Sequence, residues 1–197
     1  ATVTTGYGRG VIQAGDKSIT EITCHAKGAH FLYPQVRTVI DIGGQDSKVI
    51  AIAPDGSVTN FVMNDKCAAG TGRFLEMMAR TLELSLEEIS TVGLQWKEEI
   101  TISSMCTVFA DSEVVSLVAQ NKALPDIVHG QNQSVASRAA ALYRRAGGTG
   151  PCMMTGGVAR NQGVVEAIQE KLGQPLFIHP DAQLCGALGA ALFALEM

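Results

Sequence analysis

The stretch Val36-Arg-Thr-Val-Ile-Asp-Ile-Gly-Gly-Gln-Asp46 decides the fold class of this chain. Residues 36–42 are mostly apolar and β-branched, which predicts a buried strand. The strand runs into Gly43-Gly44, and paired glycines let consecutive backbone N–H groups point at phosphate oxygens. Asp41, at the tip of the strand, offers a carboxylate that can hold a magnesium ion directly or through water. A plain turn would explain this motif equally well if it stood alone.

A second glycine motif follows about 110 residues later, as a count along the printed sequence shows. Here a predicted strand over residues 152–154 runs into Thr155-Gly156-Gly157, and Asn161 opens a predicted helix over residues 161–172. A strand, a glycine turn and a helix in this order suit a flat ligand such as a nucleotide base, packed against backbone. The motif is as weak alone as the first, but the two together favour a nucleotide site.

The remaining pattern predicts an α/β protein with a mixed sheet. Residues 48–53 and 58–63 read as strands on either side of the turn Pro54-Asp-Gly-Ser57, so a hairpin meander extends the first strand. A short strand is expected at 100–103 and another at 176–179. Ser85 with Glu88 forms a capping-box pattern that opens a short helix. Apolar spacing predicts further helices over residues 17–33, 73–84, 106–121, 126–146 and 182–196.

Composition excludes several classes of protein. Of 197 residues, 46% are hydrophobic and 17% charged, which argues against a disordered chain or a coiled coil. The net charge is −4, and no basic run exceeds Arg144-Arg145, so no nucleic-acid partner is expected. Apolar stretches are broken within about ten residues, too short to span a membrane. The first twenty residues or so lack the pattern of a signal peptide, so the expected location is cytoplasmic.

The chain has five cysteines, an odd number without any C-x-x-C pair, which argues against a disulfide framework or a self-contained zinc site. Cys67 and Cys106 each stand just before or at a predicted helix N-terminus, where the helix dipole favours a thiolate. Two such thiolates would be half of a four-thiolate iron–sulfur site, and a two-fold dimer is the natural source of the other half. Taken singly, each of the two cysteines is more simply interpreted as a buried core residue. Cys24, Cys152 and Cys185 lie outside such contexts and are expected to be small buried apolar residues.

Four motifs carry a resemblance to a known family: residues 41–46, 64–74, 106–113 and 155–161. They resemble the activator components of 2-hydroxyacyl-CoA dehydratases and the related ATPase subunits of benzoyl-CoA reductases, the BadF/BadG/BcrA/BcrD ATPase family. The blocks K-C-A-A-G-T-G-R-F and S-x-C-T-V-F-A-x-S-E are the most specific, and the resemblance runs from Thr5-Gly-Tyr-Gly-Arg9 to the C-terminus. It implies the actin, Hsp70 and sugar-kinase ATPase fold, with a ribonuclease H-like lobe.

The resemblance implies an ATP-dependent one-electron donor. One [4Fe-4S] cluster would bridge a homodimer through Cys67 and Cys106 of each subunit. The electron would come from a ferredoxin or flavodoxin and pass to a partner 2-hydroxyacyl-CoA dehydratase or benzoyl-CoA reductase-type enzyme. ATP or ADP and Mg²⁺ would be bound by residues of the two glycine motifs: Asp41 for the metal ion; Gly43, Gly44, Gln45 and Asp46 for phosphates; and Gly156 and Gly157 for adenosine. Asp41 and Gln45 are the expected catalytic residues, Gln45 as the group that positions the attacking water.

The sequence departs from the pattern of this family in one respect. Family members carry a D-x-G-S/T phosphate loop upstream of the T-G-Y-G-R stretch, and this sequence contains no such loop. We therefore expect residues 1–37 to be a remnant of an N-terminal lobe that is largely missing, and residues 38–197 to be the nucleotide- and cluster-binding lobe. The expectation is weak ATP binding by this chain alone. Two alternatives stay open: a cluster-free small-molecule (sugar-type) kinase of the same superfamily, and a dimeric scaffold or sensor with a labile cluster.

Overall fold

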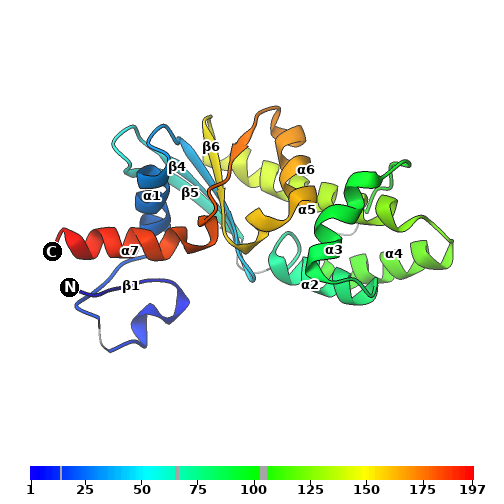
Figure 1. Ribbon diagram of the computed structural model, residues 1–197, viewed down its shortest axis with the longest axis horizontal. Coiled ribbons are helices and arrows are strands. Elements are labelled where there is room, and N and C mark those ends of the chain that lie inside the picture. The colour runs from blue at the N-terminus through cyan, green and yellow to red at the C-terminus, as the bar shows by residue number, and fades with distance from the viewer. Residues whose placement is uncertain (14, 65–66, 103–105) are drawn as a thin grey trace.

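The computed structural model describes residues 1–13, 15–64, 67–102 and 106–197, and it is built around a five-stranded sheet (Figure 1). The strand order is β5-β4-β3-β6-β7. β3 pairs antiparallel with β4, and β4 with β5, whereas β3–β6 and β6–β7 are parallel, so the predicted meander and mixed sheet are confirmed. The strands are β3 (Thr38–Ile42), β4 (Ser47–Ile52), β5 (Val58–Asn64), β6 (Cys152–Thr155) and β7 (Leu176–Phe177).

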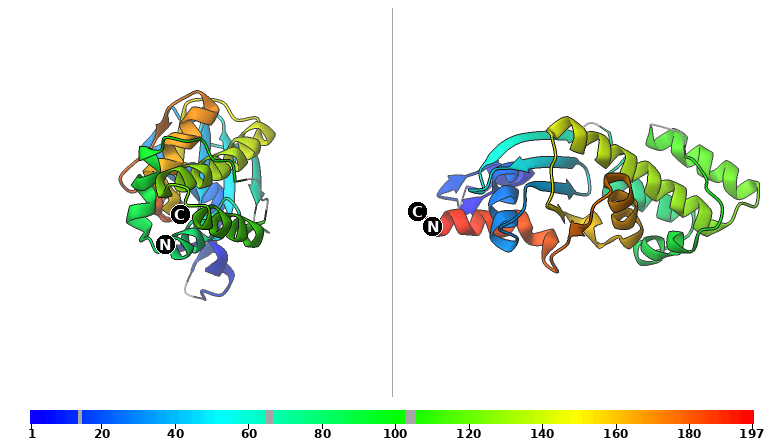
Figure 2. Two further views of the ribbon diagram at one scale, coloured as in Figure 1. Left: turned by 90° about the vertical axis from the view of Figure 1, so that its right-hand side faces the viewer. Right: turned by 90° about the horizontal axis from the view of Figure 1, so that it is seen from above.

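The helices form two groups along an elongated molecule (Figure 2). Beside the sheet lie α1 (Glu21–Leu32), α5 (Leu124–Ala146), α6 (Gln162–Leu172) and α7 (Cys185–Leu195). At the other end of the molecule lie α2 (Gly72–Thr81), α3 (Leu86–Thr91) and α4 (Thr107–Ala119). α5 connects the two parts, because it packs on β4 and β5 and also contacts α4. The short strands β1 (Val3–Thr4) and β2 (Lys17–Ser18) pair with each other next to α7.

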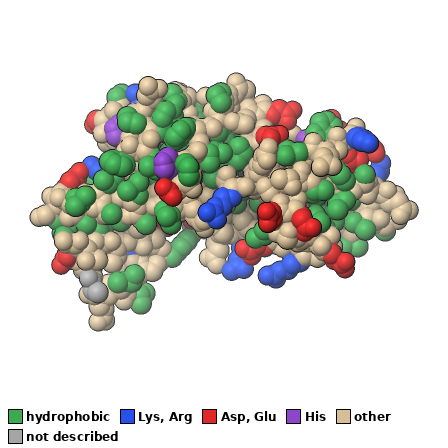
Figure 3. Space-filling view, viewed as in Figure 1, with side chains coloured by type: hydrophobic (Ala, Val, Ile, Leu, Met, Phe, Trp, Pro, Cys, Tyr) green, Lys and Arg blue, Asp and Glu red, His purple; other side chains and the backbone are tan. Residues whose placement is uncertain are grey.

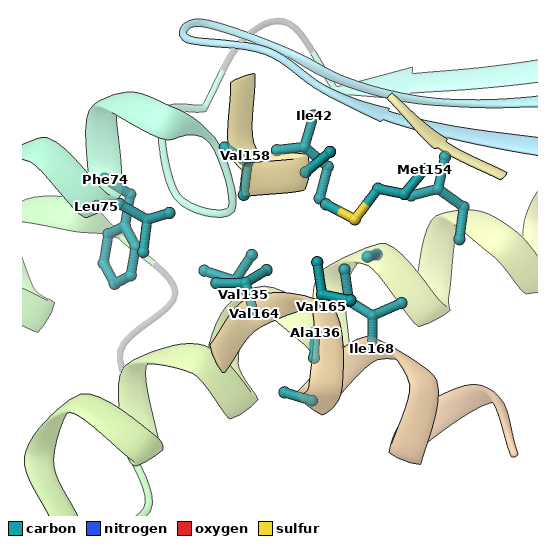
Figure 4. Close-up of a cluster of buried hydrophobic side chains, with 14 of the residues drawn as sticks. Ile42, Phe74, Leu75, Val135, Ala136, Met154, Val158, Val164, Val165 and Ile168 are labelled. Carbon is teal, nitrogen blue, oxygen red and sulfur yellow. The ribbon is translucent and has the colours of Figure 1, made fainter. Parts of the chain in front are cut away.

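The strands β3, β4 and β6 are buried on both faces, whereas the edge strand β5 is largely exposed. Side chains along a strand alternate between the two faces of the sheet. Ile40 and Ile42 of β3 face the larger core, which α2, α5 and α6 complete, whereas Val39 faces the smaller core beneath α1. Figure 4 shows Ile42 and Met154 pointing from the sheet region towards Val165 of α6.

On the outer surface, charged side chains of both signs are spread over the part where α2 and α3 lie (Figure 3). No helix among the described residues is long and apolar enough to cross a membrane.

Several predicted element ends differ from the structure for local reasons. α1 begins at Glu21 rather than residue 17, because Thr20 caps it by accepting a hydrogen bond from Thr23 N. The helices predicted to reach residues 84 and 121 end at 81 and 119, because Glu83 and Asn121 adopt left-handed φ values of 55° and 56°. The predicted C-terminal helix is divided into a 3₁₀ turn at Ala182–Leu184 and α7. The predicted strand at 176–179 is confined to Leu176–Phe177.

The strand predicted at 100–103 is wrong for the described residues 100–102, and residue 103 lies outside the description. Ile100 and Ile102 are buried while Thr101 is exposed, an alternation that looks like a strand in the sequence. The segment instead packs on α5, where Gly130 leaves space for the carbonyl of Ile100. The capping box predicted at Ser85 and Glu88 is confirmed at the start of α3.

The helices α1 and α7 approach each other more closely than side chains normally permit. A Cβ on Gly28 of α1 would collide with the backbone carbonyl of Cys185, and a Cβ on Gly189 of α7 would collide with that of Cys24. Each helix therefore presents a glycine to the backbone of the other. This reciprocal contact lets α1 and α7 pack backbone against backbone.

Candidate functional site

The register of the sheet places three polar side chains in a row at the ends of β3, β4 and β6. Asp41 lies opposite Lys48 on one side and opposite Thr155 on the other. Lys48 Nζ donates to Asp41 Oδ2 at 2.8 Å, and Thr155 Oγ1 donates to Asp41 Oδ1 at 2.8 Å. Asp41 is only 3% exposed. Both oxygens of this buried carboxylate are therefore occupied by groups of the chain itself.

The Lys48 ammonium is the centre of a larger ionic cluster. Its Nζ lies 2.9 Å from Glu21 Oε1 of α1 and 3.0 Å from Asp46 Oδ2, in addition to the bond with Asp41. Tyr7 donates its hydroxyl to Asp46 Oδ2 at 3.1 Å. One ammonium thus faces three carboxylates, and His25 Nδ1 lies 3.4 Å from Asp41 Oδ1, where it adds a second positive charge when the ring is protonated. In either state the carboxylates outnumber the positive charges. Since the cluster draws on residues 7 to 48, it joins the N-terminal segment to the sheet.

The pKa values in this cluster move in the direction that keeps both partners charged. Burial by itself raises the pKa of the Asp41 carboxyl, but the charges of His25 and Lys48 and the bonds from Lys48 and Thr155 hold it below its usual range. Burial by itself lowers the pKa of the Lys48 ammonium, but Asp41, Glu21 and Asp46 together raise it above its usual value. The sequence motif located Asp41 but not Lys48. The signal that could have located Lys48 is the hairpin itself, which sets it opposite Asp41 across the turn at 43–46.

The glycine turn after β3 opens onto a cavity of about 760 Å³. Gly43 N donates to Asp46 O at 3.0 Å and closes the turn. Gly43 and Gly44 line the cavity, and Gly157 from the second glycine motif also lines it, so the structure brings the two motifs together. Other described residues of the lining are Gly72, Leu75, Glu76, Leu86, Glu87, Ser90, Thr91, Val158, Arg160, Asn161 and Gln183. Most of these are residues that the sequence analysis did not single out.

The other predicted ligand residues lie around the cavity rather than in its described lining. Asp41 and Asp46 are buried behind the glycine turn, and Gln45 is exposed at its tip. Gly156 has a φ of 83°, and a Cβ there would lie 2.7 Å from the carbonyl carbon of Ile42. Gly156 therefore allows the second turn to pack directly on the end of β3.

The glycine turn is hydrogen-bonded to the start of α2, the helix that follows Cys67. Gly72 N donates to Gly43 O and Arg73 N donates to Gly44 O, both at 2.8 Å. The start of α2 thus uses two of its first backbone N–H groups, which have no partner within the helix, to hold the turn. A third bond, from Ser47 Oγ to Gly70 O at 2.7 Å, ties the end of the loop to β4.

The cysteines fall into two classes by burial. Cys67 and Cys106 are exposed and form no disulfide within the described part of the chain, and Cys106 is the N-cap residue of α4. Cys24, Cys152 and Cys185 are buried, and burial raises the pKa of each thiol, that of Cys185 to about 12.

The two helices that begin near the exposed thiols are bonded to each other. Thr81 Oγ1 of α2 donates to Asp111 Oδ1 of α4. The helix that follows Cys67 and the helix that Cys106 caps therefore belong to one packed unit.

A scan against family models matches residues 1–194 to the BadF/BadG/BcrA/BcrD ATPase family. The chain belongs to this family. The resemblance inferred from the motifs is thereby confirmed, and so is the prediction of an ATPase family member. The match covers the glycine motifs and both cysteine motifs, so the elements described above are parts of one family domain.

Solved structures of related proteins agree with this assignment. Component A of (R)-2-hydroxyglutaryl-CoA dehydratase from Acidaminococcus fermentans is 50% identical, with a TM-score of 0.96 over 98% of this chain and 75% of its own. An activator of 2-hydroxyisocaproyl-CoA dehydratase from Clostridium difficile, solved with bound ADPNP, is 47% identical, with a TM-score of 0.95 over 98% of this chain and 72% of its own. This chain thus spans about three quarters of the length of each.

The predicted fold class is confirmed by these structures and by more distant ones. MreB 5 of Spiroplasma citri, solved with AMPPNP, shares the fold at 16% identity, with a TM-score of 0.50 over 92% of this chain and 60% of its own. The fold is that of the actin-like ATPases. Its mixed sheet with flanking helices is the arrangement that the strand and glycine patterns predict.

The cysteine region of this BadF/BadG/BcrA/BcrD family member suits an iron–sulfur cluster by its chemistry. Soft thiolate ligands select such clusters. Cys106 is the N-cap residue of α4 as predicted, whereas Cys67 lies five residues before Gly72, the first residue of α2, and not directly at the helix start. Among the described residues, no group of three or more His, Cys, Asp or Glu side chains is arranged to hold a metal ion. Two exposed cysteines are half the number of thiolates that a four-cysteine cluster needs, so the described residues of one chain do not complete such a site.

Proposed function

We propose that this chain is an ATP-dependent one-electron donor that activates a 2-hydroxyacyl-CoA dehydratase or a benzoyl-CoA reductase-type enzyme. The names of its relatives support the class of partner, since they are a component and an activator of two 2-hydroxyacyl-CoA dehydratases. The electron donor in this proposal is a ferredoxin or flavodoxin. A [4Fe-4S] cluster, when bound, supplies the one-electron carrier, and Cys67 and Cys106 of two chains would hold it.

A homodimer is part of the proposal, and the surface of α4 supports it. Val108 and Phe109, two and three residues after Cys106, are 67% and 68% exposed. Val115 and Val118 continue the exposed apolar residues along α4. Large apolar side chains at a helix surface favour burial against a partner. A second copy would cover these residues where its own Cys67 and Cys106 complete the set of four thiolates.

In this proposal the cavity beside the glycine turns binds the nucleotide. The backbone at Gly43 and Gly44 would meet the phosphates, and Gly156 and Gly157 would shape the side that meets adenosine. Asp41 is already bonded by Lys48 and Thr155, and Asp46 by Lys48 and Tyr7, so in this proposal the nucleotide phosphates and water would hold Mg²⁺ and these two carboxylates would contribute only their charge. Gln45, exposed at the tip of the turn, would orient the attacking water.

The observation that carries the proposal is the direct bonding between the glycine turn and the start of α2. A movement of Gly43 and Gly44 when phosphates bind would pull on the N–H groups of Gly72 and Arg73. Cys67 lies five residues before Gly72, so the same movement would reach a cluster ligand. The nucleotide cavity and the cysteine loop are therefore mechanically connected through backbone, and side-chain rearrangements are not required.

The cluster-free kinase alternative fits the site less well. A sugar-type kinase needs a carboxylate that can accept the proton of a substrate hydroxyl. Both oxygens of Asp41 accept hydrogen bonds from groups of the chain, and Asp46 Oδ2 is bonded by Lys48 Nζ and by the hydroxyl of Tyr7. Neither carboxylate is presented to the cavity as a base. The kinase alternative also leaves the two exposed cysteines without a role.

The proposal is tested by preparing the protein without oxygen and measuring iron, sulfide and ATP hydrolysis. We expect about four iron and four sulfide per two chains, a number set by the cluster type. We also expect ATP-dependent transfer of one electron to an added 2-hydroxyacyl-CoA dehydratase from the reduced protein. Protein that contains no iron after reconstitution, while it still folds and binds nucleotide, would contradict the proposal and favour the kinase.

A further inference from the structure

Arg138 of α5 lies beside the loop that carries Cys67. Both residues line one cavity of about 650 Å³, on a different part of the surface from the nucleotide cavity. The Arg138 side chain is partly buried, and its Nη1 donates to both the backbone oxygen and the hydroxyl of Ser134, one helical turn earlier. The guanidinium is thereby held in one orientation on α5.

The loop after Cys67 is shaped around the Arg138 side chain. Gly70 adopts a φ of 89°, and a Cβ at this position would lie 2.9 Å from Arg138 Cδ. A residue with a side chain would thus be strained by its backbone and crowded by the arginine. The Ser47 hydroxyl holds the carbonyl of Gly70 from the other side. The loop is therefore clamped between β4 and Arg138, three residues after Cys67.

Arg138 also lies within electrostatic reach of Cys67. Burial lowers the pKa of the Arg138 guanidinium, and the interaction with a Cys67 thiolate acts in the opposite direction. A guanidinium stays protonated in proteins, so its positive charge is permanent. Arg145 and Lys171 line the same cavity, but the tight contact with Gly70 involves Arg138.

We propose that Arg138 is a positioning residue for the one-electron step: it holds the Cys67 loop and places a permanent positive charge beside the reducible group. This inference rests on the proposed function. One electron from the ferredoxin- or flavodoxin-class donor adds one negative charge next to the guanidinium, and no bond is formed or broken. The arginine favours the reduced state by attracting that charge, and partial burial keeps solvent from screening it fully.

The test compares Arg138→Gln with Arg138→Lys and with the matched control Arg145→Gln, which removes a charge from the same helix and the same cavity. Each protein is reconstituted without oxygen, its iron is counted, and its midpoint potential is measured by spectroscopic redox titration. We expect Arg138→Gln to lower the ratio of reduced to oxidised protein about tenfold at a fixed potential, equal to about 59 mV for one electron. Arg138→Lys should recover most of this ratio, and Arg145→Gln should change it less than about twofold.

The outcomes separate this inference from the proposed function. A parent chain without iron overturns both. A parent and an Arg138→Gln variant that bind equal iron and share one midpoint potential overturn the role of Arg138 alone. If Arg138→Gln binds no iron, the lysine variant decides: iron retained by Arg138→Lys supports the inference, and iron lost from both variants in folded protein overturns the role of the charge.

Discussion

Around Asp41 the polar side chains are buried and bonded to one another, whereas around Cys67 and Cys106 the reactive side chains face solvent. Asp41 and Lys48 are 3% exposed each, and both lie in a cluster supplied entirely by this chain. The two thiols are exposed, and so is Phe109 next to Cys106. A buried charge needs its partners within the fold, but an exposed ligand pair leaves room for groups from outside.

Under the proposed function, one polypeptide builds the ionic cluster completely but supplies only part of the ligands of the cysteine site. Substitutions near Asp41 should therefore reduce the stability of the chain itself. Substitutions near the cysteines should leave the fold intact and change what the chain holds or associates with. The following four predictions use this difference, beginning with the largest expected effect.

The largest effect is expected for the exposed cysteines. Cys67→Ala or Cys106→Ala should abolish iron binding, because each variant removes two of the four thiolates of a dimer. The thermal midpoint of the metal-free chain should hardly change, since neither thiol is packed in the core. Cys152→Ala is the matched control, and it should keep the iron while it lowers the thermal midpoint, because Cys152 is 1% exposed. Iron analysis and thermal unfolding of the three variants test this prediction. Full iron content in the Cys67→Ala variant would show that Cys67 is not a ligand.

The next effect is expected for Lys48. Lys48→Met should lower the free energy of unfolding by about 3–5 kcal/mol, because it leaves buried carboxylates without their counter-charge. Lys122→Met is the control: its ammonium pairs with Glu98 at 2.6 Å, but the two side chains are 34% and 58% exposed. That substitution should cost less than about 1 kcal/mol. Denaturant unfolding measures the free energy of unfolding of both variants. An equal decrease in the two would show that burial of the ionic cluster contributes nothing to stability.

A smaller effect is expected for the connection between the two regions. A Cβ at residue 72 would lie 3.1 Å from Gly43 O and 3.2 Å from Gly44 Cα, so Gly72→Ala should displace the glycine turn. We expect Mg-ADP to bind about tenfold more weakly, or about 1.4 kcal/mol, by calorimetric titration. Gly8→Ala, where a Cβ would meet nothing within 4 Å, should leave affinity unchanged. Unchanged binding by a folded Gly72→Ala variant would mean that the turn and α2 are not coupled.

The smallest effect is expected for the apolar surface of α4. Phe109→Ser should weaken the dimer about fivefold, or about 1 kcal/mol, if the phenyl ring is buried against a second copy. Leu195→Ser is the matched control at the other end of the molecule, where the leucine is 83% exposed at the end of α7. Sedimentation of the cluster-loaded protein at several concentrations compares the two. A dimer that is weakened equally by both substitutions would argue against an interface at α4.

The sequence contains the features of the site that are local. The strand before Gly43, the turn after β6 and the position of Cys106 at the start of α4 each depend on a few consecutive residues, so their patterns predict them, whereas the predicted helix start at Cys67 lies five residues later, at Gly72. The contacts that join these motifs depend on the tertiary structure. Nothing near Gly72 in the sequence indicates that its N–H group bonds to Gly43, because the two residues meet only after β4 and β5 have folded between them.

The ionic cluster and the wrong strand show the same limit. Lys48 is opposite Asp41 in a short hairpin, which a register argument can reach, but Glu21 comes from α1 and Tyr7 from a 3₁₀ turn before it. Ile100 and Ile102 alternate with a polar residue as in a strand, yet α5 offers a helix surface in place of a strand edge. Periodicity reports which side chains are buried, and the neighbouring element decides which backbone conformation buries them.

The reciprocal glycine contact between α1 and α7 has a consequence for which sequences the fold can accept. In a library of all single substitutions, most surface positions of these helices should tolerate many residues, but positions 28 and 189 should accept glycine alone. At both positions a Cβ would collide with a backbone carbonyl of the opposing helix. Every residue type has this carbonyl, so a second substitution cannot remove the collision. No compensating change in a neighbouring side chain can rescue either position. A variant at Gly28 should therefore be restored only by separating the helices, and the library would identify this contact without any measurement of structure.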